Sequence, residues 1–183
     1  MKSGLLLLGI FLILISCEKE DSANQSLIPK GSYPDQESWD ATVIISDEGR
    51  TVGEITAGHV EKYSSRQLLN LSDSIIVHFY NRNGVHTSVL YAVGGIVYEK
   101  KQNMMAFGNV VVISDSGVTL FTDTLNWNNE DQKVYSETPV KVITDKSDTL
   151  YGESFISDPD LINYEIIKPR GKSSKRITIQ DEQ

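Results

Sequence analysis

The chain has 183 residues, of which 25 are acidic and 17 are Lys or Arg, so its formal net charge is −8 at neutral pH. This acidity, without any block of basic residues, makes nucleic acids and anionic lipid surfaces poor partners. The length suits one domain with tails, and the single cysteine excludes a disulfide within the chain.

The N-terminus has the layout of an export signal. Lys2 precedes an unbroken apolar run at residues 5–15, and a small residue then precedes Cys17. The run is too short to span a membrane securely, which takes roughly 20 apolar residues. We therefore expect residues 1–16 to be a lipoprotein signal peptide; a plain signal peptide with an incidental cysteine, or an uncleaved short anchor, is the alternative.

The end of this segment, Leu14-Ile15-Ser16-Cys17, resembles the bacterial lipobox. Proteins with that motif are cut just before the cysteine, whose sulfur carries a diacylglycerol. The resemblance implies a lipid on Cys17, and more than one acyl chain is needed for stable anchoring. Residues 17–40 are polar and rich in turn formers, so we expect an acylated flexible tether there.

From Ala41 the residue pattern becomes typical of strands and hairpins. Short runs of Val, Ile, Thr, Tyr and Phe alternate with Gly, Asn, Asp and Ser. Residues 53–67 are the only candidate helix, and their β-branched residues and glycine argue against it. Residues 93–95 are expected to form a bend or bulge. We assign residues 41–168 to one β domain.

The last segment, residues 169–183, is expected to be a polar C-terminal tail. Its charges are mixed, and no apolar period extends through it. Ile177 and Ile179 could nevertheless form one last edge strand.

A turn followed by a strand recurs at a steady spacing in the domain. Ile55, Leu90, Leu120 and Leu150 each follow a polar turn, at intervals of 35, 30 and 30 residues. Such a period indicates stacked supersecondary units. Because one hairpin cannot bury its apolar face alone, four of them predict an elongated β-stack with open strand edges at both ends. An ordinary β-sandwich with a dry core is the alternative.

No residue pattern points to catalysis, a metal or a cofactor. His59, His78 and His86 lack metal-ligand spacing, so a surface or cross-strand role is expected for each. Neither a nucleophile elbow nor a Gly-rich phosphate loop is present. The carboxylates lie in turns, where Asp bonds the backbone. We therefore expect a protein that is not an enzyme.

The order and spacing of several stretches resemble the LptC family of lipopolysaccharide-export proteins, in the lipoprotein form found in the Bacteroidota. Together they run over most of residues 34–168. LptA and the periplasmic domain of the outer-membrane assembly protein share the repeat, but the N-terminal tether and the short array favour LptC. The matching stretches are residues 34–38, 46–50, 108–112, 120–127, 138–140, 150–158 and 164–166.

This resemblance implies an all-β fold, an elongated twisted β-jellyroll that is open along one side and at its ends. It implies a periplasmic component, tethered to the inner membrane, that accepts lipopolysaccharide from an ABC transporter and passes it to LptA. The commonest form of the family has a membrane-spanning helix, which a lipid on Cys17 would replace here. A β-sandwich lipoprotein that binds a protein or glycan, in the periplasm or at the cell surface, is the alternative.

A carrier of acyl chains needs a continuous apolar groove, and alternation along a strand turns one face inward. Strand addition at the open edges would join neighbouring domains: Val43 and Ile45 on the transporter side, Tyr164 and Ile166 on the LptA side. The residues predicted to contact acyl chains are Ile44, Ile55, Ala57, Ile75, Val77, Phe79, Leu90, Ala92, Val110, Val112, Leu120, Trp127, Val140, Val142 and Leu150.

Overall fold

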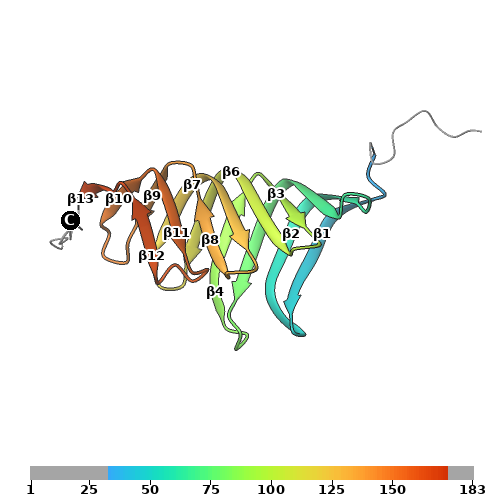
Figure 1. Ribbon diagram of the computed structural model, residues 1–183, viewed down its shortest axis with the longest axis horizontal. Coiled ribbons are helices and arrows are strands. Elements are labelled where there is room, and N and C mark those ends of the chain that lie inside the picture. The colour runs from blue at the N-terminus through green and yellow to red at the C-terminus, as the bar shows by residue number, and fades with distance from the viewer. Residues whose placement is uncertain (1–32, 173–183) are drawn as a thin grey trace, which may run out of the picture.

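The computed structural model describes residues 33–172 (Figure 1). The expected signal peptide, Cys17 and most of the tether lie outside this range, as do Ile177 and Ile179. Over the described range the chain contains strands and no helix, so it offers no helix that is long and apolar enough to span a membrane.

The strands form a single antiparallel sheet, which confirms the predicted all-β class. They are β1 (Gln36–Asp47), β2 (Arg50–Tyr63), β3 (Leu68–Tyr80), β4 (His86–Ala92), β5 (Gly94–Tyr98), β6 (Asn103–Ser114), β7 (Thr119–Asn128), β8 (Lys133–Ser136), β9 (Val140–Ile143), β10 (Thr149–Gly152), β11 (Ser154–Ser157), β12 (Tyr164–Ile167) and β13 (Arg170–Lys172).

The long strands β1, β2, β3, β6 and β7 bend near their middles, so each belongs to two half-sheets. The first half-sheet has the order β1-β2-β3-β4-β6-β7-β9-β10-β13. The second has the order β1-β2-β3-β5-β6-β7-β8-β11-β12. The two half-sheets meet along one bend line and enclose the core, in agreement with the expected twisted β-jellyroll.

Local backbone chemistry explains where the bend line runs. Asp40, Asp73 and Asn109 have φ values of 48°, 59° and 51°, and short polar residues tolerate this left-handed region best. On β2 the bend falls at Gly58, where an added Cβ would lie 2.5 Å from the carbonyl oxygen of Asp73. Only glycine allows the two backbones to approach so closely.

The bend expected at residues 93–95 is confirmed, and it lies on the same line. β4 ends at Ala92 and β5 begins at Gly94. Between them, the Val93 N–H donates to the Gly108 carbonyl at 3.0 Å, and the Val93 carbonyl accepts from the Ser74 N–H at 3.1 Å. These bonds carry the sheet across the bend without leaving the backbone of Val93 unpaired.

The repeat found in the sequence corresponds to the first half-sheet. The hairpins β1–β2, β3–β4, β6–β7 and β9–β10 stack there in chain order. Ile55, Leu90 and Leu120 are buried, and Leu150 is half-buried against the core. The second half-sheet was not predicted, because it is built from the other halves of the long strands and from the short strands β5, β8, β11 and β12.

Strands extend beyond residues 41–168 at both ends. β1 begins at Gln36, inside the segment expected to be a tether, and β13 continues to Lys172. Residues 36–40 form an edge that is mostly exposed, so no apolar period marks them. Backbone and ring contacts hold them instead: the Asp35 N–H donates to the Lys62 carbonyl at 2.7 Å, and Trp39 stacks on His59.

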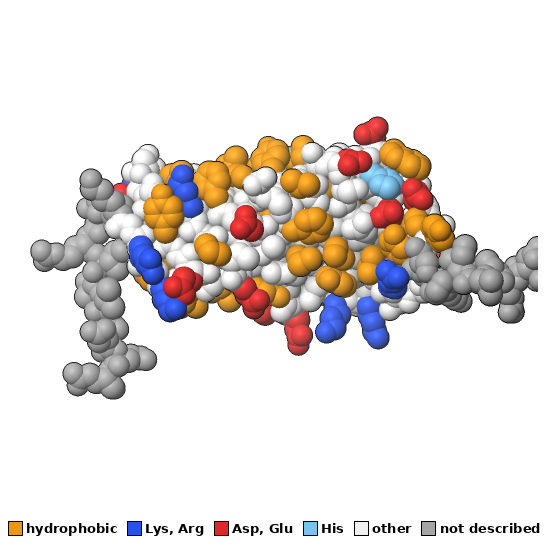
Figure 2. All heavy atoms as spheres, turned by 90° about the horizontal axis from the view of Figure 1, so that it is seen from above, with side chains coloured by type: hydrophobic (Ala, Val, Ile, Leu, Met, Phe, Trp, Pro, Cys, Tyr) orange, Lys and Arg blue, Asp and Glu red, His pale blue; other side chains and the backbone are white. Residues whose placement is uncertain are grey.

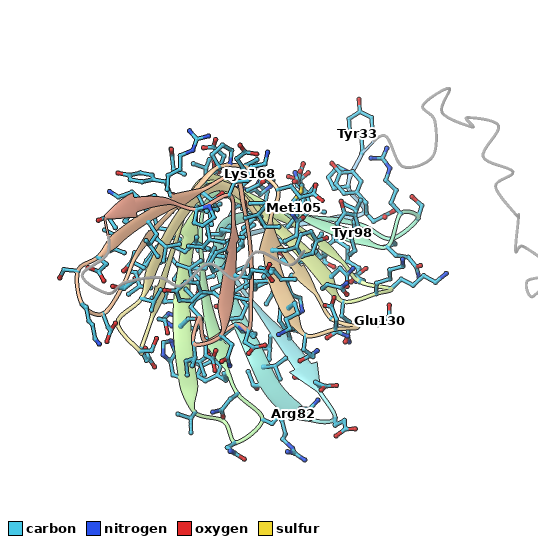
Figure 3. The ribbon with its side chains drawn as sticks, turned by 60° about the vertical axis from the view of Figure 1, so that its left-hand side comes forward. Tyr33, Arg82, Tyr98, Met105, Glu130 and Lys168 are labelled. Carbon is cyan, nitrogen blue, oxygen red and sulfur yellow. The ribbon has the colours of Figure 1, made fainter. Side chains whose placement is uncertain are left out.

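The half-sheets diverge from the bend line towards two rows of turns. Figure 3 shows Lys168 at the ridge where they meet, and Arg82 and Glu130 at their far ends. Figure 2 views the molecule from the ridge and shows apolar side chains spread over the middle of that side. Tyr91 and Val93, at or next to the bend between β4 and β5, are exposed apolar residues. The interior is therefore reached from the opposite side, between the rows of turns.

Candidate functional site

An apolar pocket of about 240 Å³ opens between the two half-sheets. Ile45, Val52 and Phe79 line it from the first half-sheet, and Met104 and Trp127 line it from the second. Phe79 and Met104 are buried members of the core, while Ile45 and Trp127 are half-buried and pack against it. The pocket is thus a mouth through which the core of the domain meets solvent.

One of the positions that line this pocket has no side chain. Gly53 pairs with Ile45 on one side and with Phe79 on the other, so it lies between two pocket-lining residues. A Cβ added to Gly53 would meet Ile45 at 3.6 Å, an ordinary contact distance. Glycine is therefore not required by the backbone here, and its effect is to leave space.

The far wall of the pocket is the turn between β11 and β12, two strands of the second half-sheet, and this turn reaches across the interior to the first half-sheet. Asp158, Pro159 and Asp160 line the pocket. Ser88 Oγ on β4 donates to the Pro159 carbonyl at 2.8 Å, and Ser114 Oγ on β6 donates to the Asp160 carbonyl. Both serines are buried, so these bonds satisfy polar groups that have no access to water.

This turn closes the interior with Leu161, whose side chain is 0% exposed. Its backbone has a φ of 56°, a conformation that leucine rarely adopts and that the surrounding contacts must hold. Its neighbour Ile162 points to solvent and is 61% exposed. We call residues 158–163 the crossing turn, because they seal the part of the interior that lies beyond the pocket.

An ion pair fixes the base of the crossing turn. Lys133 Nζ lies 2.5 Å from Asp158 Oδ1, and Asn163 Nδ2 donates to Asp158 Oδ2 at 3.1 Å. The hydrogen bond from Lys133, followed by that from Asn163, lowers the pKa of Asp158 below its usual value of 3.8. The carboxylate therefore stays charged, and holds the turn, over the whole physiological pH range.

The structure places most of the predicted groove residues inside the domain, although contact with acyl chains remains a prediction. Trp127 and Leu150 are half-buried and pack against the core. The buried members of the set are Ile55, Ala57, Ile75, Val77, Phe79, Leu90, Ala92, Val110, Val112, Leu120, Val140 and Val142.

The inward orientation predicted for Ile44 is wrong. Its side chain is 53% exposed on the outer face of β1. Cross-strand partners share a face, and Val43 pairs with buried Ile55 whereas Ile44 pairs with Glu54. Because residues 43–45 are all apolar, alternation alone could not decide which of them points inward.

The strands expected to form open edges are terminal strands of the sheet within residues 33–172. β1 pairs only with β2, and β12 pairs only with β11. Val43, Ile45, Tyr164 and Ile166 lie on them, half-buried against the core. The first half-sheet ends in β13, a third terminal strand that the sequence did not indicate. Which partners these edges bind remains a prediction.

Sequence reasoning missed several residues that shape the pocket. Met104 and Ala106 are two residues apart on β6 and both are buried. This alternation would have revealed the second half-sheet if residues 103–107 had been identified as a strand. Leu161, an apolar residue in the polar stretch 158–163, was a second available signal. Nothing in the local pattern marks Arg82, which lies in a hairpin turn and lines the pocket.

The histidines have the surface and cross-strand roles expected of them. His78 on β3 and His86 on β4 lie with Nδ1 and Nε2 3.1 Å apart, and His86 Nδ1 lies 2.8 Å from the Asp115 carboxylate. His59 contacts Glu37 across the β1–β2 pair at 3.1 Å. In the part of the chain that the structure describes, no group of three or more His, Cys, Asp or Glu residues could hold a metal ion.

Comparison with known proteins identifies one family. Residues 4–150 match the family described as "Lipopolysaccharide-assembly, LptC-related". The matched range covers more than half of the chain and includes every strand from β1 to β9. No curated protein matches the chain.

Proposed function

Because this chain belongs to the LptC-related family of lipopolysaccharide assembly, we propose that it is a periplasmic bridge component that accepts lipopolysaccharide from the inner-membrane ABC transporter and passes it to LptA. Membership itself places the protein in lipopolysaccharide transport, as a transport component on the periplasmic side of the inner membrane. The route of the lipid and the identity of both neighbours are the parts that we add.

The observation that carries this proposal is the mouth between the half-sheets. Acyl chains are apolar, and burying their surface is favourable by roughly 25 cal/mol per Å². The pocket offers such surface at Phe79, Met104 and Trp127, and it leads directly into the core. At about 240 Å³ it is smaller than the roughly 300–1,000 Å³ of pockets that enclose drug-sized ligands. Several acyl chains therefore require the half-sheets to separate further.

The terminal strands support a place between two neighbours. Within residues 33–172, β1 and β12 each have one edge without a strand partner; in the proposed bridge, the edge of β1 binds the transporter's periplasmic domain and that of β12 binds LptA. A bridge built by strand addition would align successive interiors. Cross-linking from cysteines placed at exposed Thr42 and Glu165 tests this arrangement: each position should capture a different neighbour.

We also propose that the protein is the lipoprotein form of the family, with residues 17–35 as the tether ahead of β1. A lipid on Cys17 would hold the domain beside the transporter in place of a membrane-spanning helix. Mass spectrometry of the mature N-terminus tests this directly. An acylated Cys17 is expected, and an intact N-terminus that retains Met1 would contradict the anchor.

Photo-cross-linking in cells tests the lipid route. A diazirine side chain at buried Leu90 or Leu120 should capture lipopolysaccharide, because both point into the interior. The adjacent outward residues Val89 and Thr119 are matched controls on the same strands. Capture only from the outward positions would contradict the proposal.

A further inference from the structure

Two arginines lie side by side at the mouth of the pocket. Arg82, in the turn between β3 and β4, lines the pocket itself. Arg50 begins β2, and its Nη1 donates to the Arg82 carbonyl at 3.2 Å. Both arginines and Val52 also line a small adjoining hollow. The tips of the β1–β2 and β3–β4 hairpins, which project together in Figure 1, thus present two cations where apolar surface meets water.

These two arginines differ from the other arginines of residues 33–172 in forming neither an ion pair nor a cation–π contact. Arg170 pairs with Glu153, and Arg66 lies over the ring of Tyr63. Arg50 and Arg82 take part in none of the ion pairs or cation–π contacts found in the described range. Their guanidinium groups are exposed and remain available to a ligand.

The carboxylates nearest to the mouth are largely engaged elsewhere. Asp158 is paired with Lys133, and Asp160 Oδ1 accepts from the Ile162 N–H at 3.0 Å. Asp47 and Glu48 share the small hollow with the arginines but form no ion pair with them. Arg82 is the one cationic side chain among the residues that line the pocket.

We propose that Arg50 and Arg82 bind the phosphate of a phosphorylated glycolipid whose acyl chains occupy the pocket. A guanidinium group matches a phosphate geometrically and can bind it through two parallel hydrogen bonds. An amphiphile that inserts its chains past Phe79 and Val52 leaves its headgroup at the rim, within reach of both hairpin tips. This inference rests on the proposed function. It adds that the rim recognises the phosphate of the lipid headgroup.

The test compares two lipid probes on the full-length chain. A diazirine side chain at Phe79 reports lipid in the pocket, with diphosphorylated lipid A as one probe and the same lipid after removal of both phosphates as the other. Changing Arg50 and Arg82 to Ala should lower capture of the phosphorylated probe about fivefold, the scale expected of two exposed charge contacts. Capture of the dephosphorylated probe should stay the same.

Matched variants separate charge from folding. Arg66→Ala removes a cation that does not line the pocket and should leave both probes unaffected. Changing Arg50 and Arg82 to Lys should restore part of the loss, because the charge returns without the planar fork. All variants should unfold at the same temperature, because both arginines are exposed.

Each other result counts against the inference. An equal loss of both probes, or no loss of either, would mean that the arginines do not recognise phosphate. If the protein with both arginines intact captures the two probes equally well at position 79, only this inference fails and the proposed lipid route stands. If the diazirine at position 79 captures neither probe, the proposed function is contradicted, and so is this inference.

Discussion

The interior of this protein is accessible at one end and sealed at the other, although the same hairpin repeat builds both. Between β1–β4 and the second half-sheet, Gly53 leaves a hollow and the pocket reaches the core. Beyond it, the crossing turn bonds to β4 and β6 and inserts Leu161 between the half-sheets. The strand pattern thus builds the walls of the interior. Gly53 and the crossing turn decide where that interior is accessible.

The largest effect is expected at Leu161. Truncation to Ala leaves a cavity in the sealed end and should lower the free energy of unfolding by about 2–5 kcal/mol. Chemical denaturation measures this directly. Ile162→Ala is the matched control, because that exposed side chain should change stability by less than about 0.5 kcal/mol. Equal effects of the two substitutions would mean that Leu161 does not seal the interior.

The next effect concerns the bonds that hold the crossing turn to the first half-sheet. Ser88→Ala removes the donor that bonds the half-buried Pro159 carbonyl, at a cost of about 0.5–1.5 kcal/mol. Hydrogen exchange should accelerate at residues 158–163 and stay unchanged in β1 and β2. Ser46→Ala, on an exposed part of β1, serves as the control. Acceleration throughout the domain would show that the turn is not a separate unit.

A smaller effect is expected from filling the open end. Gly53→Ala fits at ordinary contact distance from Ile45, so stability should stay the same or rise by up to about 1 kcal/mol. The added methyl narrows the pocket, so photo-capture of lipopolysaccharide at Phe79 should fall. The outward substitution Thr56→Ala on the same strand should leave capture unchanged. Undiminished capture in the Gly53 variant would place the lipid elsewhere.

The smallest effect is a pH dependence of the stability of the crossing turn. The pKa of Asp158 is lowered in the folded state, so its contribution is complete above about pH 4 and is lost as the pH falls through the lowered value. The amide resonance of Ile162 should therefore shift only in strongly acidic solution. Asp158→Asn should remove that transition; a transition that persists in the variant belongs to another group.

The sequence predicted the first half-sheet well, because each of its hairpins carries a polar turn and an alternating strand. It missed the second half-sheet, since a strand such as β6 continues through Gly108 and Asn109, residue types that usually mark a turn, so its two halves do not stand out as one strand. The inward residue of β1 was also missed, because only its pairing with β2 distinguishes Ile44 from Ile45. Leu161 acts through a contact between distant segments, which local patterns do not reveal.

The most direct test of the account uses these two neighbouring residues of β1. Ile45 lines the pocket, whereas Ile44 lies on the outer face and is more exposed. With a diazirine side chain at either position in cells, lipopolysaccharide should be captured from position 45 and not from position 44. Random collision would favour the more exposed position. Capture from position 44 alone, or from neither, would contradict a lipid route through the interior.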